Sequence, residues 1–359
     1  MIKEAIGKVV AGDNLAEDEM HRAMDEIISG TATSAQIAAL ITALRLKGET
    51  VDEITGAARA MRAKATRMNL NNHLVNVDRD EINVEDETIL DTCGTGGDGT
   101  HTFNVSTATA LVAAGGGVRV AKHGNRAVSS LCGSSDVLES LGVNLDMTVT
   151  DVERCIREVG IGFLYAPLFH SAMKHAVKAR QEIGIRTIFN LLGPLTNPAG
   201  ASAQVLGVYA LELTEKMAQV LNRLHTREAF VVCGEGTFDE ISVCGLTRVS
   251  HLKEGDVRTF EMTPEGFGFK RAPLEAIRGG NARENAQIIR DIVDGEKGPK
   301  RDMVVLNSAA AFMASGLAGG FVEGAERAVE AIDSGRAREK LNQLIAFTQQ
   351  CRPFIRDEC

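Results

Sequence analysis

The glycine-rich sequence Asp91-Thr92-Cys93-Gly94-Thr95-Gly96-Gly97-Asp98-Gly99 stands between two predicted elements. A short apolar run at residues 88–90 predicts a buried strand before it, and helical spacing of apolar residues predicts a helix over residues 104–114 after it. Glycines allow backbone N–H groups to approach an anion closely, and the N-terminus of a helix adds its dipole. The segment therefore predicts a phosphate-binding loop at the start of a βαβ unit.

The same glycines also match the G-x-G-x-x-G spacing of dinucleotide-binding proteins, through Gly94, Gly96 and Gly99. That reading requires an acidic residue near the end of the next strand, where it would bind ribose hydroxyls. The next predicted strand, residues 118–121, leads instead into the basic segment 122–126. A nicotinamide cofactor is thus disfavoured. The alternative that the glycines form only a tight turn is less favoured, because two polar loops follow neighbouring strands.

Strand and helix patterns alternate through the rest of the chain and predict an α/β fold with a mostly parallel central sheet covered by helices. Further strands are expected at residues 161–165, 203–209, 229–233 and 302–306. A helix over residues 150–160 has a predicted capping box of Thr150 and Glu153. Turn formers and β-branched residues at 246–270 suggest a small antiparallel addition.

The first 70 or so residues predict a small helical bundle. One helix is expected to be capped by Asn14 and Glu17, the next to stop at Gly48, and a third to begin with Thr50 and Glu53. Polar residues 69–87 lack periodicity and suggest a linker or surface excursion. We therefore predict a helical domain at residues 1–72, joined by helices from about 166–190, and a catalytic domain at residues 73–359.

The composition narrows the class of protein. The 359 residues carry a formal net charge of -9, which argues against a general nucleic-acid binder. Seven cysteines without paired spacing do not suggest a disulfide framework or a zinc site. The sequence shows no signal peptide and no apolar run long enough to span a bilayer, so we expect a cytoplasmic protein without membrane partners.

Two further segments carry possible chemistry. Asp239 and Glu240 follow a predicted strand, and adjacent carboxylates are suitable ligands for Mg²⁺, although such a pair is often a solvated turn. His170 and His175 share a predicted basic helix with Arg180, which could bind a carboxylate through two hydrogen bonds. A solvated basic face is an equally good interpretation of that helix. A metal role for the two histidines is disfavoured, because no third ligand is apparent.

The serines at 129–130 and 134–135 remain ambiguous, since they could donate to phosphate or cap the following helix. No Ser, Cys or Lys stands beside an evident base in a nucleophile motif. The sequence therefore favours a displacement between two bound substrates over a covalent intermediate.

Together, residues 91–98, 104–107, 122–130 and 239–240 resemble the signature set of the anthranilate phosphoribosyltransferases. Residues 166–175, residues 186–198 and the helix around residues 36–40 are similar to that family as well, so the resemblance covers nearly the whole chain. It implies the nucleoside-phosphorylase-like phosphoribosyltransferase fold, a homodimer built through the helical domain, Mg²⁺ as cofactor, and a role in tryptophan biosynthesis. The implied substrates are phosphoribosyl pyrophosphate and anthranilate, without nucleic acid.

The resemblance also implies residue roles. Mg²⁺ would be bound by Ser106, Asp239 and Glu240, and anthranilate would contact Gly94, Asn125 and Arg180. Phosphoribosyl pyrophosphate would contact residues from the glycine-rich loop to the start of the helix after residue 134: Gly94, Gly97, Asp98, Thr102, Asn104, Val105, Ser106, Thr107, Lys122, His123, Gly124, Asn125, Arg126, Ala127, Val128, Ser129, Ser130 and Ser134.

The chain departs from the family pattern at two places. Residues 71–87 look longer than the usual approach to the glycine-rich loop, and Cys132 occupies a position where another small residue is common. Two alternatives share the fold. A pyrimidine nucleoside phosphorylase would use a similar loop with inorganic phosphate, and some relatives without biosynthetic activity bind nucleic acid. Residues 122–130 with Asp239 and Glu240 favour the anthranilate enzyme, and the acidic balance disfavours a nucleic-acid binder.

Overall fold

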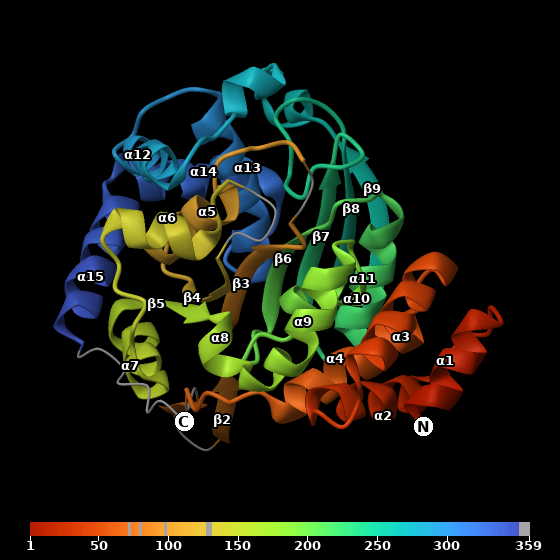
Figure 1. Ribbon diagram of the computed structural model, residues 1–359. Coiled ribbons are helices and arrows are strands. Elements are labelled where there is room, and N and C mark those ends of the chain that lie inside the picture. Colours follow the sequence, from red (N-terminus) through yellow and green to blue (C-terminus); the bar gives the residue numbers. More distant parts are fainter. Residues whose placement is uncertain (71–72, 79–80, 97–98, 127–130, 352–359) are drawn as a thin grey trace.

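The computed structural model describes residues 1–70, 73–78, 81–96, 99–126 and 131–351. Its N-terminal part is a bundle of α1 (Ile2–Val10), α2 (Glu17–Ile28), α3 (Ser34–Lys47) and α4 (Val51–Lys64). This bundle lies beside a larger α/β body (Figure 1). Helices α2 and α4 approach closely at Gly56, where a Cβ atom would lie 2.2 Å from the carbonyl oxygen of Glu17.

The helix boundaries in the bundle correct the sequence prediction in part. Thr50 and Glu53 form the predicted capping box of α4, and α3 ends at Gly48. The first cap was predicted at the wrong position, because α2 begins at Glu17 and the Glu19 carboxylate accepts the N–H of Ala16. Asn14 instead accepts a hydrogen bond from Lys47. Helix α1 was not predicted; it is short and amphipathic, and its apolar side packs on α3.

The larger body contains a seven-stranded sheet with the order β5-β4-β3-β6-β7-β8-β9. The strands are β3 (Ile89–Gly94), β4 (Arg119–Gly124), β5 (Ile161–Tyr165), β6 (Ala203–Gly207), β7 (Glu228–Gly234), β8 (Thr247–Lys253) and β9 (Asp256–Met262). Strands β3 to β7 pair in parallel, whereas β8 and β9 extend the same sheet in antiparallel fashion. The predicted α/β class with a mostly parallel sheet is confirmed, and the antiparallel addition belongs to the main sheet.

Helices cover both faces of this sheet, and the strands alternate accordingly. In β7, Phe230 and Val232 pack among α5 (Val105–Gly115), α12 (Ala282–Val293), α13 (Pro299–Ala314), α14 (Phe321–Asp333) and α15 (Arg336–Gln350). Val231 and Cys233 face a second cluster, shared with α11 (Glu212–Arg223) and the N-terminal bundle. This two-sided burial explains the nearly continuous apolar runs of the strands.

Short helices connect the bundle to the sheet. After β5 the chain forms α8 (Ala166–Phe169), a 3-10 turn at Ser171–Met173, α9 (Lys174–Ile183) and α10 (Ile188–Leu192). Helix α9 contacts α2 and α3, and α10 contacts α3 and α4. The predicted single helix carrying His170 and His175 is therefore interrupted: His170 lies between α8 and the 3-10 turn, and His175 lies in α9.

Two other predictions were wrong. Residues 302–306, which were predicted to form a strand, belong to α13. The prediction failed because a short apolar run fits a buried strand and a helix that is buried on most sides equally well. Helix α7 (Val149–Val159) is capped by Thr148 with Asp151, not by Thr150 with Glu153. Helix α6 (Ser134–Leu141) precedes it.

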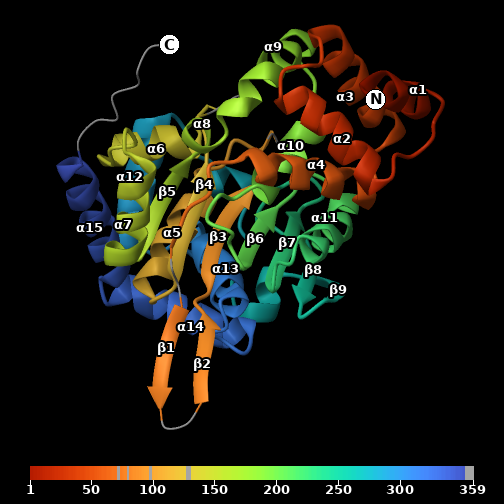
Figure 2. The same ribbon diagram turned by 90° about the horizontal axis from the view of Figure 1, so that it is seen from below.

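The polar residues before β3 form a hairpin of β1 (His73–Asp78) and β2 (Glu81–Asp86), which projects from the body (Figure 2).

Candidate active site

The four central parallel strands end in glycine at one edge of the sheet, at Gly94, Gly124, Gly207 and Gly234. Strand β3 lies between β4, the next strand in sequence, and β6. The strand order therefore reverses direction between β3 and β6. Ligands of open α/β sheets bind outside the carboxyl ends of the strands at such a point. The glycine-rich loop leaves β3 at this position, as the sequence predicted.

Asp239 packs against the carboxyl ends of β3 and β6. Its Oδ2 accepts the backbone N–H of Gly96 at 2.8 Å. A Cβ atom at Gly94 would lie 2.4 Å from the same oxygen, and one at Gly207 would lie 1.5 Å from the Asp239 carbonyl oxygen. Glycine is therefore required at both strand ends by close approach. The fold thus brings Asp239 to the glycine-rich loop.

Glu240 reaches the first turn of α5. Its Oε1 accepts the backbone N–H of Ser106 at 3.1 Å, at the end of the helix where N–H groups lack partners within the helix. The hydroxyl of Thr92 donates to the Ser106 carbonyl oxygen at 2.8 Å. The three predicted metal-binding residues, Ser106, Asp239 and Glu240, thus lie around one loop, although β7 and α5 are distant in sequence.

Lys122 lies beneath this loop and is only 3% exposed. Its ammonium group donates to the Thr92 carbonyl oxygen and, at 3.2 Å, to the hydroxyl of Ser106. Burial lowers the pKa of Lys122, and the nearby Asp91 and Glu240 carboxylates oppose that shift. Lys122 therefore places a buried positive charge below the floor of the predicted anion site.

His123, the next residue, points to the opposite face of β4. Its ring lies 5.1 Å from the ring of His170, measured between centroids, and its Nδ1 is 3.2 Å from the Gly193 carbonyl oxygen. Burial lowers the pKa of His123 to about 3 and that of His170 to about 4, so both rings are neutral near pH 7. Within the part of the chain that the structure describes, neither Nε2 atom has a hydrogen-bond partner.

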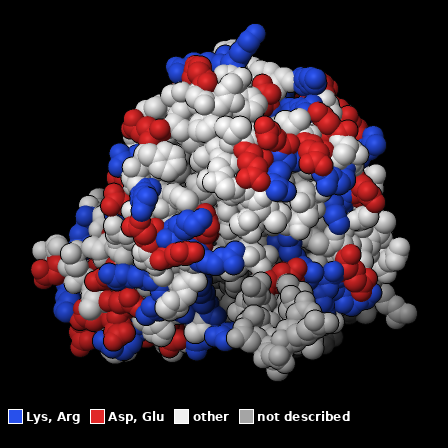
Figure 3. Space-filling model, turned by 180° about the vertical axis from the view of Figure 1, so that it is seen from behind, with Lys and Arg blue, Asp and Glu red and all other residues white. Residues whose placement is uncertain are grey.

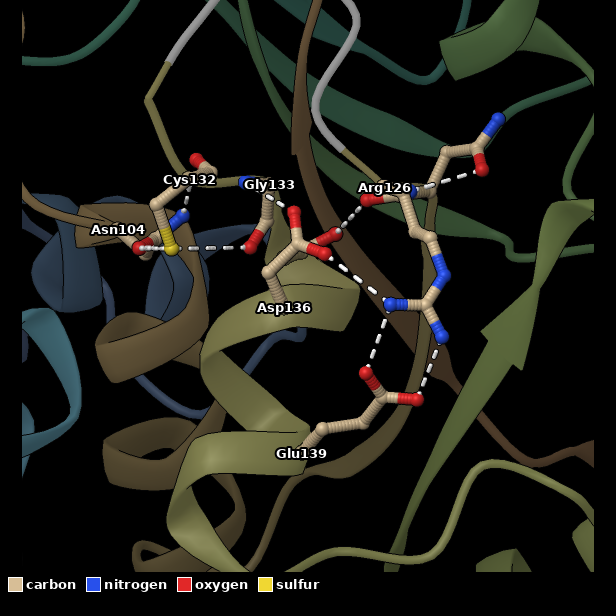
Figure 4. Close-up of polar contacts among 8 residues, drawn as sticks. Asn104, Arg126, Cys132, Gly133, Asp136 and Glu139 are labelled. Carbon is tan, nitrogen blue, oxygen red and sulfur yellow. Dashed lines mark hydrogen bonds and ion pairs between the residues drawn. The ribbon is translucent and has the colours of Figure 1, made fainter. Parts of the chain in front are cut away.

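The segment after β4 is held against α6 (Figure 4). The Arg126 guanidinium binds the Glu139 carboxylate through two hydrogen bonds, at 2.7 and 2.8 Å, and also contacts Asp136 at 3.2 Å. The carbonyl oxygen of Asn125 accepts the Ser134 hydroxyl at 3.3 Å. The Arg126 guanidinium therefore joins this segment to α6.

Four further predicted donor-binding residues, Thr102, Asn104, Val105 and Thr107, lie at or just before the start of α5. Asn104 is the N-cap residue, and Thr102 pairs with Arg278 in an isolated β-bridge. Val105 and Thr107 are both buried; Val105 belongs to the hydrophobic core, whereas the Thr107 hydroxyl has no hydrogen-bond partner among the described residues. Predicted residues Gly97, Asp98, Ala127, Val128, Ser129 and Ser130 lie outside the described residues.

Arg180, the predicted carboxylate-binding residue, lies on α9 away from the other predicted anthranilate contacts in sequence. Its guanidinium stacks on the ring of Phe189 at 5.1 Å from the centroid. It forms no ion pair with any of the described residues, and desolvation lowers its pKa. A partly buried guanidinium without a carboxylate partner is suited to binding an acidic ligand.

Sequence reasoning missed several contributors to this site. Gly207 lies against Asp239, Phe189 stacks with Arg180, and His170 lies beside His123. His170 and residues 186–198 were noted in the sequence, but no local pattern predicts these pairings. Asn285 bonds Asn104 from α12, 181 residues away. A contact between such distant positions leaves no signal in a single sequence.

Surface charge is mixed. Over the face in Figure 3, Lys and Arg side chains are interspersed with Asp and Glu side chains. Exposed ion pairs also occur along the chain, for example between Arg327 and Glu323. That face shows no continuous basic stripe of the kind that follows a nucleic-acid backbone. Among the described helices, none has the length and apolar character needed to cross a membrane.

Comparison with known proteins shows which family the chain resembles over nearly its whole length. Residues 86–338 match the model of the glycosyl transferase family, a/b domain, and residues 3–65 match that of the glycosyl transferase family, helical bundle domain. The anthranilate phosphoribosyltransferase of Geobacter sulfurreducens is 57% identical over 350 residues, covering 98% of this chain and 100% of the relative. That of Trichlorobacter lovleyi is 53% identical, covering 97% and 100%.

Solved structures are similar over the same length. The crystal structure of anthranilate phosphoribosyltransferase from Thermus thermophilus aligns with a TM-score of 0.86 at 44% identity, covering 96% of this chain and 99% of that one. The enzyme from Saccharomyces cerevisiae in complex with PRPP and Mg aligns with a TM-score of 0.86 at 29% identity, covering 97% and 98%. The family predicted from the sequence is confirmed: the chain belongs to the glycosyl transferase family of these two domains and, within it, to the anthranilate phosphoribosyltransferases.

Proposed function

We propose that the crevice at the ends of β3, β4 and β6 binds phosphoribosyl pyrophosphate and that Arg180 presents anthranilate to it. The chain is a pentosyltransferase that transfers the phosphoribosyl group to the amine of anthranilate, giving N-(5-phosphoribosyl)anthranilate and pyrophosphate, in tryptophan biosynthesis. The supporting observation is the pair of hydrogen bonds that join Asp239 to Gly96 and Glu240 to Ser106, because they assemble carboxylates around an anion-binding loop.

Magnesium suits this arrangement. The Asp239 and Glu240 carboxylates and the Ser106 hydroxyl are hard oxygen ligands, which Mg²⁺ prefers. The yeast relative was solved in complex with PRPP and Mg. Bound here, the ion would neutralise the charge that develops on the leaving pyrophosphate. The described residues contribute by holding both carboxylates against the loop through Gly96 and Ser106.

The reaction breaks the bond between the anomeric carbon and the pyrophosphate oxygen and forms a bond from that carbon to the anthranilate nitrogen. We infer that bond breaking leads, giving an oxocarbenium-like state that the amine attacks from the opposite face. An aromatic amine is neutral at working pH, so its lone pair needs no strong base; once the new bond has formed, the nitrogen releases one proton to solvent. Rate enhancement then comes from positioning and from electrostatic stabilisation of the leaving group. In this proposal Gly94, Asn125 and Arg180 contact anthranilate, and the other site residues, together with Gly94 and Asn125, contact the donor.

We also propose a cytoplasmic homodimer formed through the helical domain. This domain comprises residues 1–72 with about 166–190, beside a catalytic domain at 73–359. Support comes from exposed apolar side chains on neighbouring helices: Val10 on α1 is 70% exposed and Leu46 on α3 is 84% exposed. Light scattering coupled to gel filtration should give a dimer, and Leu46→Glu should shift it toward a monomer. A monomeric wild-type protein would refute the proposal.

The transferase reaction is tested by following anthranilate fluorescence with the purified chain, phosphoribosyl pyrophosphate and Mg²⁺. We expect a loss of signal that requires the donor and is abolished by EDTA. No loss with folded protein would refute the function. Phosphate-dependent cleavage of thymidine would then indicate a nucleoside phosphorylase, and a salt-dependent DNA mobility shift a nucleic-acid-binding relative.

A further inference from the structure

Asn285 lies in the first turns of α12, is 1% exposed, and connects two segments of the crevice. Its Oδ1 accepts the backbone N–H of Gly280 at 2.7 Å, and its Nδ2 donates to Oδ1 of Asn104 at 3.0 Å. Asn104 in turn donates from Nδ2 to the Cys132 carbonyl oxygen at 3.3 Å. A chain of amides thus runs from α12 through the start of α5 to the segment before α6.

Backbone groups fix the direction of this chain at both ends. The N–H of Gly280 can only donate, so the atom of Asn285 that faces it must be the carbonyl oxygen, and the NH₂ group must face Asn104. The carbonyl oxygen of Cys132 can only accept, so the NH₂ group of Asn104 must face it. Rotating either amide by half a turn would bring donor against donor or acceptor against acceptor. The orientation of Asn104 is therefore determined.

Most of the hydrogen-bonding groups of the Asn104 side chain are engaged within the protein. Its Oδ1 accepts from Asn285, and the Cys132 thiol lies at 3.4 Å from both this oxygen and the Gly133 carbonyl oxygen, so its single hydrogen is shared between two acceptors (Figure 4). One hydrogen of its Nδ2 is engaged by the Cys132 carbonyl oxygen. One N–H remains. Because Asn104 is the half-buried N-cap of α5 beside the glycine-rich loop, that N–H is available to a ligand oxygen.

The backbone around Asn285 is closely fitted. Gly279 donates its N–H to the His101 carbonyl oxygen at 3.0 Å, and Arg278 pairs with Thr102 in a β-bridge. A Cβ atom at Gly279 would lie 2.6 Å from Oδ1 of Asn285 and 2.6 Å from Cα of Phe103. The loop before α12 is therefore seated against the segment that leads to Asn104, so Asn285 meets Asn104 in a fixed geometry.

We propose that Asn285 is a positioning residue for phosphoribosyl transfer. It holds the Asn104 amide so that its remaining N–H donates to an oxygen of the ribosyl donor, and it acts only through Asn104. This inference rests on the proposed function, in which Asn104 contacts the donor. It predicts that a change at Asn285, a buried residue outside the predicted contact set, selectively weakens use of the donor.

Asn285→Asp provides the test. The variant keeps the size and the acceptor for Gly280 but places an oxygen against Oδ1 of Asn104, which removes the donor that sets the orientation. We expect the KM for phosphoribosyl pyrophosphate to rise about tenfold, as for the loss of one oriented hydrogen bond to a charged ligand. The KM for anthranilate should stay within about twofold of wild type. If Asn285→Asp fails to fold, Asn285→Ser, which is smaller and uncharged, is measured with the same two outcomes.

Asn144→Asp is the matched control. Asn144 also accepts a backbone N–H through Oδ1, from Asp146, and donates through Nδ2, to the Thr348 carbonyl oxygen, but it packs on α15. If replacing a buried amide by a carboxylate only destabilises the fold, both variants should melt at a lower temperature and keep the wild-type KM for the donor. If Asn285→Asp shows only that loss, with a wild-type KM for the donor, the proposal is overturned.

A double-mutant cycle tests the route through Asn104. In an Asn104→Ala background, Asn285→Asp should change the KM for the donor by less than about twofold, since coupled residues are not additive. An undiminished effect in that background would overturn the proposal. Failure of the proposed function is distinguishable, because the wild-type chain would then show no turnover at all.

Discussion

The carboxylate of Asp239 and the backbone N–H of Gly96 are joined at 2.8 Å across 143 positions of sequence. This hydrogen bond brings the segment after β7 onto the glycine-rich loop after β3, at the point where the strand connections diverge. Gly94 and Gly207 pack closely against the same residue, so a side chain at either position would collide with Asp239.

Gly94→Ala should therefore reduce turnover sharply. A Cβ atom 2.4 Å from Oδ2 would displace the Asp239 carboxylate, and a shift of about 1 Å in an active site can cost about 100-fold in rate. Steady-state kinetics would measure the loss. Gly7→Ala in α1 is the control, because a Cβ there meets no atom within 4 Å and activity should be unchanged. A Gly94→Ala enzyme with wild-type turnover would contradict the close-approach argument.

Asp239→Asn and Glu240→Gln should raise the Mg²⁺ concentration needed for half-maximal activity. Each variant keeps an oxygen acceptor for its loop N–H, Gly96 or Ser106, while removing the negative charge. Since changes in residues that merely support metal ligands cost about 10–100-fold in affinity, we expect at least a tenfold increase. Metal titrations of turnover would measure it. Normal turnover of both variants at low Mg²⁺ would refute the metal assignment.

Arg180→Ala should raise the KM for anthranilate by about tenfold or more, because a hydrogen-bonded charge pair with the substrate carboxylate is lost. The KM for phosphoribosyl pyrophosphate should change much less. Lys178→Ala, on the same helix but 77% exposed and near Glu182, serves as control and should leave both constants unchanged. A larger effect on the donor than on anthranilate would remove Arg180 from the acceptor site.

The protein should lose stability as the pH falls below about 6.5, the pKa of an unfolded histidine. In the folded state, burial lowers the pKa of His123 to about 3 and that of His170 to about 4. Between these values and 6.5 the unfolded chain binds more protons, so each histidine lowers stability by up to about 1.4 kcal/mol per pH unit as the pH falls.

Melting temperatures of wild type and His170→Gln between pH 7 and pH 4.5 would test this window. The variant should lose less stability than wild type as the solution is acidified, because glutamine does not titrate. Parallel pH profiles for the two proteins would show that His170 does not carry the effect.

Glu53→Ala should destabilise the helical bundle without affecting either KM. Glu53 is fully buried and accepts hydrogen bonds from Leu15 N, Thr50 N and Lys47 Nζ, at 2.8 to 2.9 Å. Removing one partner of a buried ion pair costs about 3–5 kcal/mol. Denaturant unfolding would measure the loss. Asp25→Ala breaks an exposed pair with Lys64 and should cost less than about 1 kcal/mol. Equal losses would show that burial is not the cause.

Local patterns in the sequence predicted much of the fold. The glycine-rich loop before α5, the capping box of Thr50 and Glu53, and the central strands were all found in this way, because each depends on neighbouring residues. Errors arose where a local pattern was ambiguous. The apolar run at 302–306 fits a strand or a buried helix equally, and Thr148 and Thr150 are competing cap residues only two positions apart.

The site shows the same division more sharply. The sequence showed the residue types of the site. Glycines before a helix predicted phosphate binding, and adjacent carboxylates after a strand predicted Mg²⁺ binding. Tertiary structure alone decided that Asp239 meets Gly96, that Glu240 meets Ser106, that Arg126 is bound by Glu139, and that Asn285 orients Asn104. The physical reason is that helix periodicity, capping and turns depend on residues a few positions apart. Contacts across a sheet edge depend instead on how whole strands and helices pack, which no local pattern records.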